Sequence, residues 1–239
     1  MVCRLYIDED ISVGSSMGLP SEQGHYLRTV MRLGPGSPLI LFNGFGGEYH
    51  ATLEILTKQE TSAYIETFND VTREMPVRVH IVQAACRSEK IDSLLQKATE
   101  LGAASFSIIR SERSSLKLDP AKRDKRIERW QKIVIEACEQ SQRTLVPNVQ
   151  WIEKLSDAPN KGLTFTLHPD TDTSWPEQRQ HFTTAADITF AIGPEGGWSH
   201  HDIETLASLG FQSLTFGPRI MRTETAAPAL LAAIQSLLD

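Results

Sequence analysis

The segment 191–226 restricts the fold of this chain more than any other part of its sequence. It contains two glycine-bearing turns, each after a short apolar run: Ala191-Ile192-Gly193-Pro194-Glu195-Gly196-Gly197 and Phe216-Gly217-Pro218-Arg219. Glycine has no Cβ atom, so the backbone can turn tightly there and approach a ligand closely. Two such turns at the ends of neighbouring strands form a crevice, which is the usual ligand site of an open α/β sheet. The sequence therefore predicts a ligand site near its C-terminal end.

The spacing of apolar residues divides the chain near residues 70–76. Before that point the sequence predicts short strands, a helix over 22–32 capped by Ser21, and a hairpin turn at Asn43-Gly44. After it, strands expected at 77–84, 106–109, 163–167, 188–192 and 214–216 alternate with helices. Alternating units of this kind indicate a parallel sheet covered on both faces. We expect a small β-barrel domain over 1–72 and an α/β domain over 73–239.

Composition narrows the class of protein. The 239 residues are 40% hydrophobic and 23% charged, which is typical of a globular chain, and no apolar run approaches the ~20 residues that span a bilayer. Cys3, Cys86 and Cys138 are odd in number and widely spaced, which favours a reducing compartment and argues against a zinc site. We expect a cytoplasmic protein that holds no metal.

The net charge of −6 is distributed unevenly along the chain. Between residues 110 and 129 there are eight basic and four acidic residues, a local excess of four positive charges. Such a patch could bind phosphates. Composition alone favours the other interpretation, a solvated helix face with pairs of opposite charge one turn apart.

The first glycine turn has a purely structural alternative, namely an ordinary connection from strand to helix, with Ser199 and Asp202 as a capping box. It is neither a dinucleotide-binding fingerprint nor a P-loop. The second turn is more specific, because Arg219, Arg222 and Glu224 crowd the start of the last helix. Thr223 or Thr225 is expected to cap that helix, and Pro228 should lie in its first turn.

Four further motifs accompany these turns: Lys97-Ala98-Thr99-Glu100-Leu101-Gly102, Ser111-Glu112-Arg113-Ser114, Glu139-Gln140-Ser141-Gln142-Arg143 before Pro147, and the stretch 25–33. In this order, and with the run 217–226, they resemble the bacterial ribosomal RNA small subunit methyltransferase E family of the SPOUT superfamily. The resemblance spans nearly the whole chain and is weakest over 1–20 and 148–190. Met221 stands where the family usually has leucine, and Trp198 where phenylalanine is common.

The resemblance implies a fold, a reaction and partners. The fold would be a SPOUT-type domain with a C-terminal trefoil knot and a parallel sheet, preceded by a PUA-like RNA-binding barrel. The reaction would be methylation of uridine N3 at the decoding centre of 16S rRNA, with S-adenosylmethionine as cofactor. The substrate would be 16S rRNA or the small ribosomal subunit, and the enzyme would be a homodimer. Periodicity alone would have predicted an unknotted sheet.

The resemblance also implies site residues. The expected cofactor-binding residues are Leu167, His168, Ile192, Gly193, Pro194, Gly196, Gly197, Phe216, Gly217, Ile220, Met221, Thr225 and Ala226. The expected RNA-binding residues are Arg4, His25, Arg28, Arg32, Arg113, Lys122, Arg123, Arg126, Arg143 and Arg219.

Uracil N3 must lose a proton before it becomes a good nucleophile, so an enzyme needs either a base or a cation that favours the anion. We expect Arg222 to supply that cation, together with Arg113, and Glu195 or Glu224 is the alternative as a base. Three other functions fit the same residues: a ribose 2′-O methyltransferase, a non-catalytic RNA-binding or assembly protein, and a small-molecule enzyme with a solvated basic patch.

Overall fold

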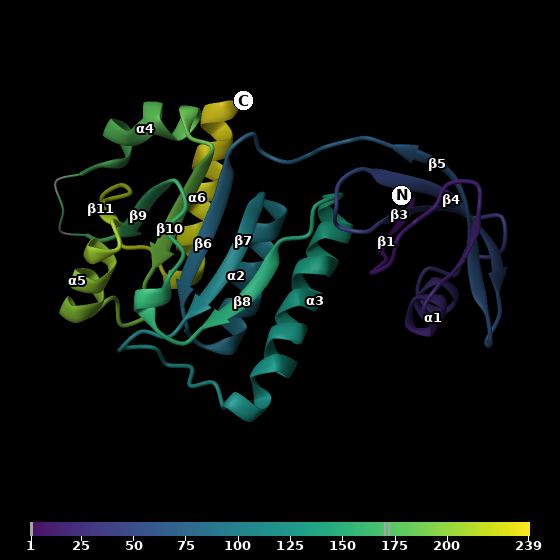
Figure 1. Ribbon diagram of the computed structural model, residues 1–239, viewed down its shortest axis with the longest axis horizontal. Helices are drawn as coiled ribbons and strands as arrows, with labels where there is room; N and C mark the ends of the chain where they lie inside the picture. The colour runs from purple at the N-terminus through teal and green to yellow at the C-terminus, as the bar shows by residue number, and fades with distance from the viewer. Residues whose placement is uncertain (1, 170, 172) are drawn as a thin grey trace. The chain divides into compact units, whose positions relative to one another are not determined.

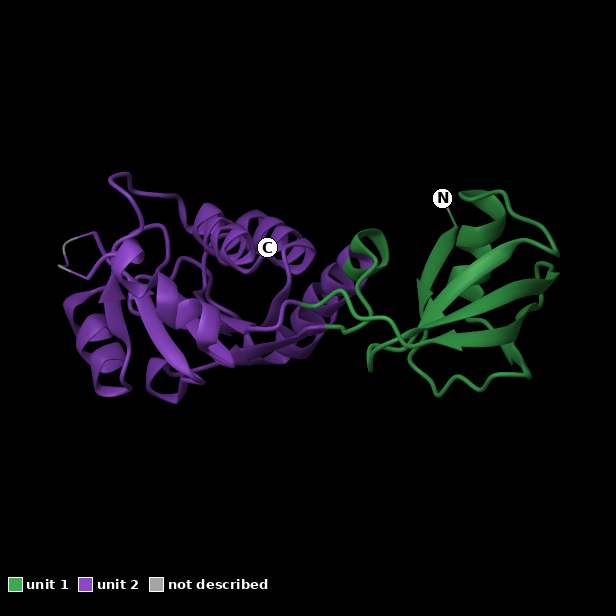
Figure 2. Cartoon of the chain, turned by 90° about the horizontal axis from the view of Figure 1, so that it is seen from above, with its two compact units in different colours: residues 1–74, 138–146 green, residues 75–137, 147–239 purple. Residues whose placement is uncertain are grey.

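The computed structural model of the protein describes residues 2–169, 171 and 173–239 (Figure 1). The chain forms two compact units, coloured separately in Figure 2. Unit 1 comprises Met1–Glu74 and Cys138–Val146, and unit 2 comprises Met75–Ala137 and Pro147–Asp239. The sequence pattern gave no sign that Cys138–Val146 belongs with the N-terminal residues.

Unit 1 contains one five-stranded sheet with the strand order β1-β3-β4-β5-β2. β1 pairs with β3 in parallel, and the other pairs are antiparallel. The predicted Asn-Gly turn does join the two strands of a hairpin, β3 and β4. The bounds are β1 Cys3–Tyr6, β2 Ser16–Gly18, β3 Pro38–Phe42, β4 Glu48–Leu56 and β5 Thr61–Asn69.

The helix of unit 1, α1 (Ser21–Thr29), packs on the core through Leu27, which is fully buried. All five strands contribute to this single apolar core. The predicted cap was wrong, because Pro20 is the N-cap residue and Ser21 is the first residue of the helix. α1 also ends earlier than predicted, and Arg32 has a positive φ of 53°, which no helical residue adopts.

Buried ion pairs explain why Cys138–Val146 belongs to unit 1. Arg4 Nη1 lies 2.6 Å from Glu48 Oε2, and Arg73 Nη1 donates both to that oxygen and to the Gln142 carbonyl. Arg143 forms a second buried pair with Glu74. Burial would raise the pKa of Glu48, but the two guanidinium groups outweigh it and hold the pKa below its usual range.

Unit 2 is built on a sheet whose described strands are all parallel, in the order β11-β9-β10-β6-β7-β8. The strands are β6 Arg78–Ala84, β7 Ala103–Ile109, β8 Asn148–Ile152, β9 Leu163–Leu167, β10 Asp187–Ile192 and β11 Gln212–Leu214. The helices are α2 Ser88–Glu100, α3 Arg123–Ser141, α4 Trp175–Thr184, α5 His200–Ser208 and α6 Thr223–Leu238, with short 3-10 turns η1 Pro120–Lys122 and η2 Leu155–Asp157. The last residues of α3, from Cys138 on, belong to unit 1.

The helices of unit 2 lie on both faces of its sheet (Figure 1). Successive side chains of a strand point to opposite faces. Val82 and Ala84 belong to the apolar cluster that includes Leu206 of α5, whereas Gln83 between them bonds to Thr223 of α6. The predicted doubly covered parallel sheet is therefore confirmed. Within the described residues, no helix is both long and apolar enough to cross a membrane.

Candidate functional site

A cavity of about 620 Å³ opens at the carboxyl ends of three strands of unit 2. Leu167, Ile192 and Leu214 are the last residues of β9, β10 and β11, and all three line it. Neighbouring parallel strands end at the same edge of a sheet, so the turns that follow them converge there. The two glycine turns singled out in the sequence form most of the cavity wall.

Most residues predicted to bind the cofactor lie together in this wall. They are Leu167, His168, Ile192, Gly193, Pro194, Gly197, Phe216, Gly217, Ile220, Met221 and Ala226. Gly196 and Thr225 are outside it. A Cβ atom on Gly196 would point toward the Arg113 side chain, 3.7 Å away, and Thr225 is exposed on the first turn of α6.

The first glycine turn is held in shape by its neighbours. Gly193 packs so closely that a Cβ atom would lie 3.2 Å from the Trp198 backbone nitrogen. Arg113 Nη1 donates to the carbonyl groups of Gly196 and Trp198, at 3.0 and 3.2 Å. The predicted capping box between Ser199 and Asp202 is present and starts α5. Arg113, which was expected to act together with Arg222, is thus bound to the first glycine turn.

The second glycine turn rests on an aromatic contact. The ring of Phe216 meets that of Trp175 edge-on, with centroids 4.8 Å apart. The residues that follow Phe216, from Gly217 to Ile220, are exposed to solvent, and Ile220 is 87% exposed. Arg219 and Arg222 line the cavity, and within the described part of the chain neither guanidinium has a hydrogen-bond or ion-pair partner. Both cations are therefore free to meet a ligand.

Thr223 joins the two turns instead of capping α6. Its hydroxyl donates to the Gly193 carbonyl at 2.6 Å and accepts from Gln83 Nε2 at 2.8 Å. The N-cap residue is Arg222, which makes no side-chain capping bond. The predicted cap by Thr223 or Thr225 was wrong. The Thr223 hydroxyl bonds to the first glycine turn and to Gln83, so it does not cap α6.

Sequence reasoning missed a charged group in the cavity wall, Lys90 of α2. Its Nζ lies 3.7 Å from Glu195 Oε1 and 3.3 Å from Glu224 Oε2. We call these three residues the Lys90–Glu195–Glu224 trio. Lys90 follows the carboxyl end of β6, and only the pairing of β6 with β10 brings it to the site. A sequence pattern does not indicate which strands pair.

Glu195 is fully engaged by neighbouring donors. It accepts hydrogen bonds from the Arg87 backbone N–H and the Ser115 hydroxyl, both at 3.2 Å. Burial would raise the pKa of Glu195, but backbone and Ser115 hydrogen bonds and the charge of Lys90 outweigh it and lower the pKa. A carboxylate with a lowered pKa is a weaker base. Glu195 therefore acts as a clamp on the glycine turn, and Glu224 is the remaining candidate base.

Cys86 lies close to the trio but is chemically quiet. Burial raises the pKa of its thiol to about 12, and the charge of Glu195 adds to the effect. A thiol in that state supplies neither a base nor a nucleophile at neutral pH. Among the described residues there is also no group of three or more histidine, cysteine and acidic side chains that could bind a metal.

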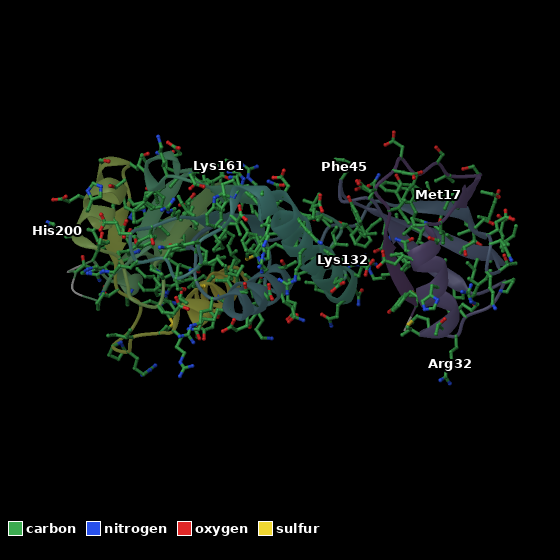
Figure 3. The ribbon with its side chains drawn as sticks, turned by 90° about the horizontal axis from the view of Figure 1, so that it is seen from below. Met17, Arg32, Phe45, Lys132, Lys161 and His200 are labelled. Atoms are coloured by element: carbon green, nitrogen blue, oxygen red, sulfur yellow. The ribbon has the colours of Figure 1, made fainter. Side chains whose placement is uncertain are left out.

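The residues predicted to bind RNA fall into three groups. Arg4 and Arg143 are buried in the ion pairs of unit 1, so they are structural. His25 and Arg28 lie on α1, where Arg28 donates to the Thr57 carbonyl, and Arg32 extends away from the ribbon in Figure 3. The others are in unit 2: Arg113, Lys122, Arg123, Arg126 and Arg219.

The basic stretch 110–129 starts at the carboxyl end of β7, the same edge of the sheet as the cavity. Some of its basic side chains form hydrogen bonds or ion pairs within the protein. Arg126 donates to Ser88, and Arg129 forms a bidentate pair with Asp92. Lys117, Lys122 and Lys125 are exposed, and no described residue pairs with them. These lysines carry the charge that a phosphate could meet.

Two family profiles match the chain. One, described as an RNA methyltransferase domain, matches residues 73–235, and the other, described as an RNA methyltransferase PUA domain, matches residues 19–61. These matches, together with the parallel sheet of unit 2, confirm the predicted α/β class and the PUA-like character of the N-terminal part.

Named relatives match over nearly the full chain. The ribosomal RNA small subunit methyltransferase E of Synechocystis sp. is 32% identical, and the match covers 100% of this chain and 79% of that protein. The protein of the same name from Bacillus subtilis is 29% identical, with 95% and 92% covered. The crystal structure of a ribosomal RNA small subunit methyltransferase E from Neisseria gonorrhoeae, bound to S-adenosylmethionine, superposes with a TM-score of 0.90 at 34% identity, over 99% of this chain and 98% of that one.

Proposed function

Because the chain belongs to the ribosomal RNA small subunit methyltransferase E family, we propose that it methylates N3 of one uridine in 16S rRNA. The uridine would lie at the decoding centre, and S-adenosylmethionine would be the methyl donor. The observation that carries the proposal is the cavity at the ends of β9, β10 and β11. Its wall contains two glycine turns and Arg222, whose guanidinium has no partner among the described residues.

The cavity suits this cofactor in size and lining. Its volume is within the ~300–1,000 Å³ typical of small-molecule sites. Gly197 and Gly217 line it with positive φ angles, and apart from the adjacent residues of the chain, a Cβ atom at either would have no atom of a described residue within 4 Å. The two turns could thus hold an adenosine moiety against their backbone, with Leu167 and Ile192 as apolar walls. When bound, S-adenosylmethionine supplies an electrophilic methyl group on a positively charged sulfur.

The protein's part in the reaction is to favour the uracil anion. A guanidinium near O2 or O4 of the base stabilises the negative charge that appears when N3 loses its proton. Arg222 is available for this, whereas Arg113 already bonds to the carbonyls of the glycine turn. We assign Arg222 as the charge-stabilising residue and retain Glu224 as the alternative, a base that would take the N3 proton.

We further propose that the enzyme is a cytoplasmic, knotted homodimer. The dimer and the knot are inferred from membership of the family. The three free cysteines agree with a reducing compartment. Light scattering during gel filtration tests the dimer, and a monomeric mass at assay concentration would contradict it.

The decisive experiment identifies the methylated nucleoside. Purified protein, S-adenosylmethionine and either free 16S rRNA or small subunits from a strain lacking the gene are combined, and the digested RNA is analysed by mass spectrometry. We expect N3-methyluridine at a single position. A 2′-O-methylated nucleoside would establish ribose methylation instead, and no methylation of either substrate would favour a non-catalytic RNA-binding role.

A further inference from the structure

The Lys90–Glu195–Glu224 trio places an unbalanced negative charge beside the cavity. One ammonium group faces two carboxylates, which leaves a formal charge of −1. All three side chains are only 20–27% exposed, so water screens them incompletely. The other cations of the cavity wall, Arg219 and Arg222, are exposed on the second turn, where solvent screens their charge.

The charge is concentrated on Glu224. Glu195 has Arg87, Ser115 and Lys90 as partners, whereas Glu224 Oε2 is buried without any hydrogen bond among the described residues. The contact of that oxygen with Lys90 is an ion pair at 3.3 Å, and Glu195 competes for the same ammonium. A buried carboxylate oxygen that accepts no hydrogen bond is poorly stabilised, so any further positive charge nearby stabilises it.

We propose that the trio makes this cavity distinguish S-adenosylmethionine from S-adenosylhomocysteine by charge. The inference rests on the proposed function and adds a role for Lys90 and Glu224 that concerns binding alone. The two molecules differ by one methyl group and by the positive charge on sulfur. Lys90 and Glu195 of the trio line the cavity, and Glu224 pairs with Lys90. The net charge of −1 on the trio stabilises the charged form more than the neutral one, so the spent cofactor is replaced more readily by a fresh one.

The test varies the charge of the trio in both directions. Glu224→Gln brings its formal charge to 0, Lys90→Gln brings it to −2, and the double variant restores −1. The dissociation constants of both molecules are measured by calorimetry at one fixed pH and ionic strength. The preference for S-adenosylmethionine should fall about three- to tenfold in Glu224→Gln, rise in Lys90→Gln, and return toward the parental value in the double variant.

A control separates charge from packing. Glu204→Gln on α5 removes a carboxylate that is paired with His200 and does not line the cavity, so it should leave the preference unchanged. Added salt should shrink the differences between variants, because the effect is electrostatic. Thermal unfolding shows which variants are folded. If one single variant is unstable, the other single variant and the double variant still allow the preference to be compared at two different charges.

The outcomes are distinct. If the affinities for both molecules fall by the same factor in every variant, the trio only holds the turns together and the inference is wrong. If the preference follows the charge of the trio in the stated order, the inference stands. If the parent protein binds neither molecule, the proposed function itself fails.

Discussion

At the scale of single residues, Gly197 is a sharp test of the cavity. Its φ of +67° disfavours a β-branched side chain, Gly197 lines the cavity, and apart from the adjacent residues of the chain, a Cβ atom there would have no atom of a described residue within 4 Å. We expect Gly197→Val to remain folded but to lose at least tenfold in affinity for S-adenosylmethionine, measured by calorimetry. Gly210→Val is the matched control, because Gly210 has a φ of +90° and equal space but lies outside the cavity. Equal affinity in both variants would contradict the assignment of the glycine turn.

Arg222 is the second residue whose role can be isolated. Arg222→Ala should slow methyl transfer by ~10²–10³, the usual effect of removing one preorganised charge-stabilising donor. Arg222→Lys should recover only part of the rate, because lysine keeps the charge but not the planar fork. Raising the pH should help the alanine variant more than the parent, since solvent then generates the uracil anion. Single-turnover rates at several pH values measure this, and a normal rate with weakened cofactor binding would make Arg222 a wall residue.

Residues of the site could be predicted where local sequence carries the signal. The glycine turns and Arg222 lie in one continuous segment, so the sequence located them. Lys90 and the hydroxyl of Thr223 could not be assigned, because their partners Glu195 and Gln83 lie more than a hundred residues away in the sequence. Arg4 and Arg143 were expected to bind RNA, and only the fold reveals the carboxylates of Glu48 and Glu74 with which they form buried ion pairs.

At the scale of elements, the capping box of α5 has a measurable worth. Ser199 Oγ accepts from the Asp202 N–H, and Asp202 Oδ2 accepts from the Ser199 N–H, both at 3.0 Å. Ser199→Ala should lower the free energy of unfolding by about 1 kcal/mol, as determined by urea denaturation. Ser208→Ala at the opposite end of α5 is the control and should change it far less. Equal losses of unfolding free energy in the two variants would mean that the capping box does not stabilise α5.

The start of β10 should make stability depend on pH. Asp187 accepts two hydrogen bonds from Arg78 and one from His80, and these bonds, Arg78 first, hold the pKa of its carboxyl well below the usual range. A depressed carboxyl pKa gives the folded state a contribution that is present in full above the unfolded-state pKa of about 4 and is lost only as pH falls through the depressed folded-state pKa. Asp187→Asn should therefore destabilise the protein at pH 7, and the deficit, measured by urea denaturation, should shrink as pH is lowered from 4 toward 2. A deficit that stays constant from pH 7 to pH 2 would contradict this account.

Helices and strands could be predicted where the spacing of apolar residues agrees with the positions of turn-forming residues. The strands at 163–167 and 188–192 and the helix from Ser199 were found because apolar runs meet clear turn signals. β8 (Asn148–Ile152) was missed, since it lies at the sheet edge and its exposed positions interrupt the apolar run. Pro228 was expected in the first turn of α6 but lies beyond it, inside the helix. Burial of Leu230, Leu231 and Ile234 outweighs the hydrogen bond that this proline removes.

At the scale of the whole molecule, RNA affinity should depend on salt through the exposed lysines of the basic stretch. Lys122→Gln with Lys125→Gln should weaken binding to 16S rRNA and reduce the log–log salt slope by about 0.7–0.9 for each phosphate that a lysine no longer neutralises. Cofactor affinity should not change, because neither lysine lines the cavity. Lys161→Gln, at the opposite edge of the sheet before β9, is the control. An unchanged slope in the double variant would mean that phosphates bind elsewhere, with Arg32 the next residue to test.

The return of Cys138–Val146 to unit 1 has a consequence for biosynthesis. A chain leaving the ribosome presents Arg4, Glu48 and Arg73 long before Gln142 has been made, and residues 75–137 must emerge in between. The N-terminal unit is therefore incomplete through much of translation, and its buried charges lack one acceptor until the chain comes back. Expressing residues 1–74 alone would reproduce that unfinished state, so a stable N-terminal fragment has to carry the later segment as well.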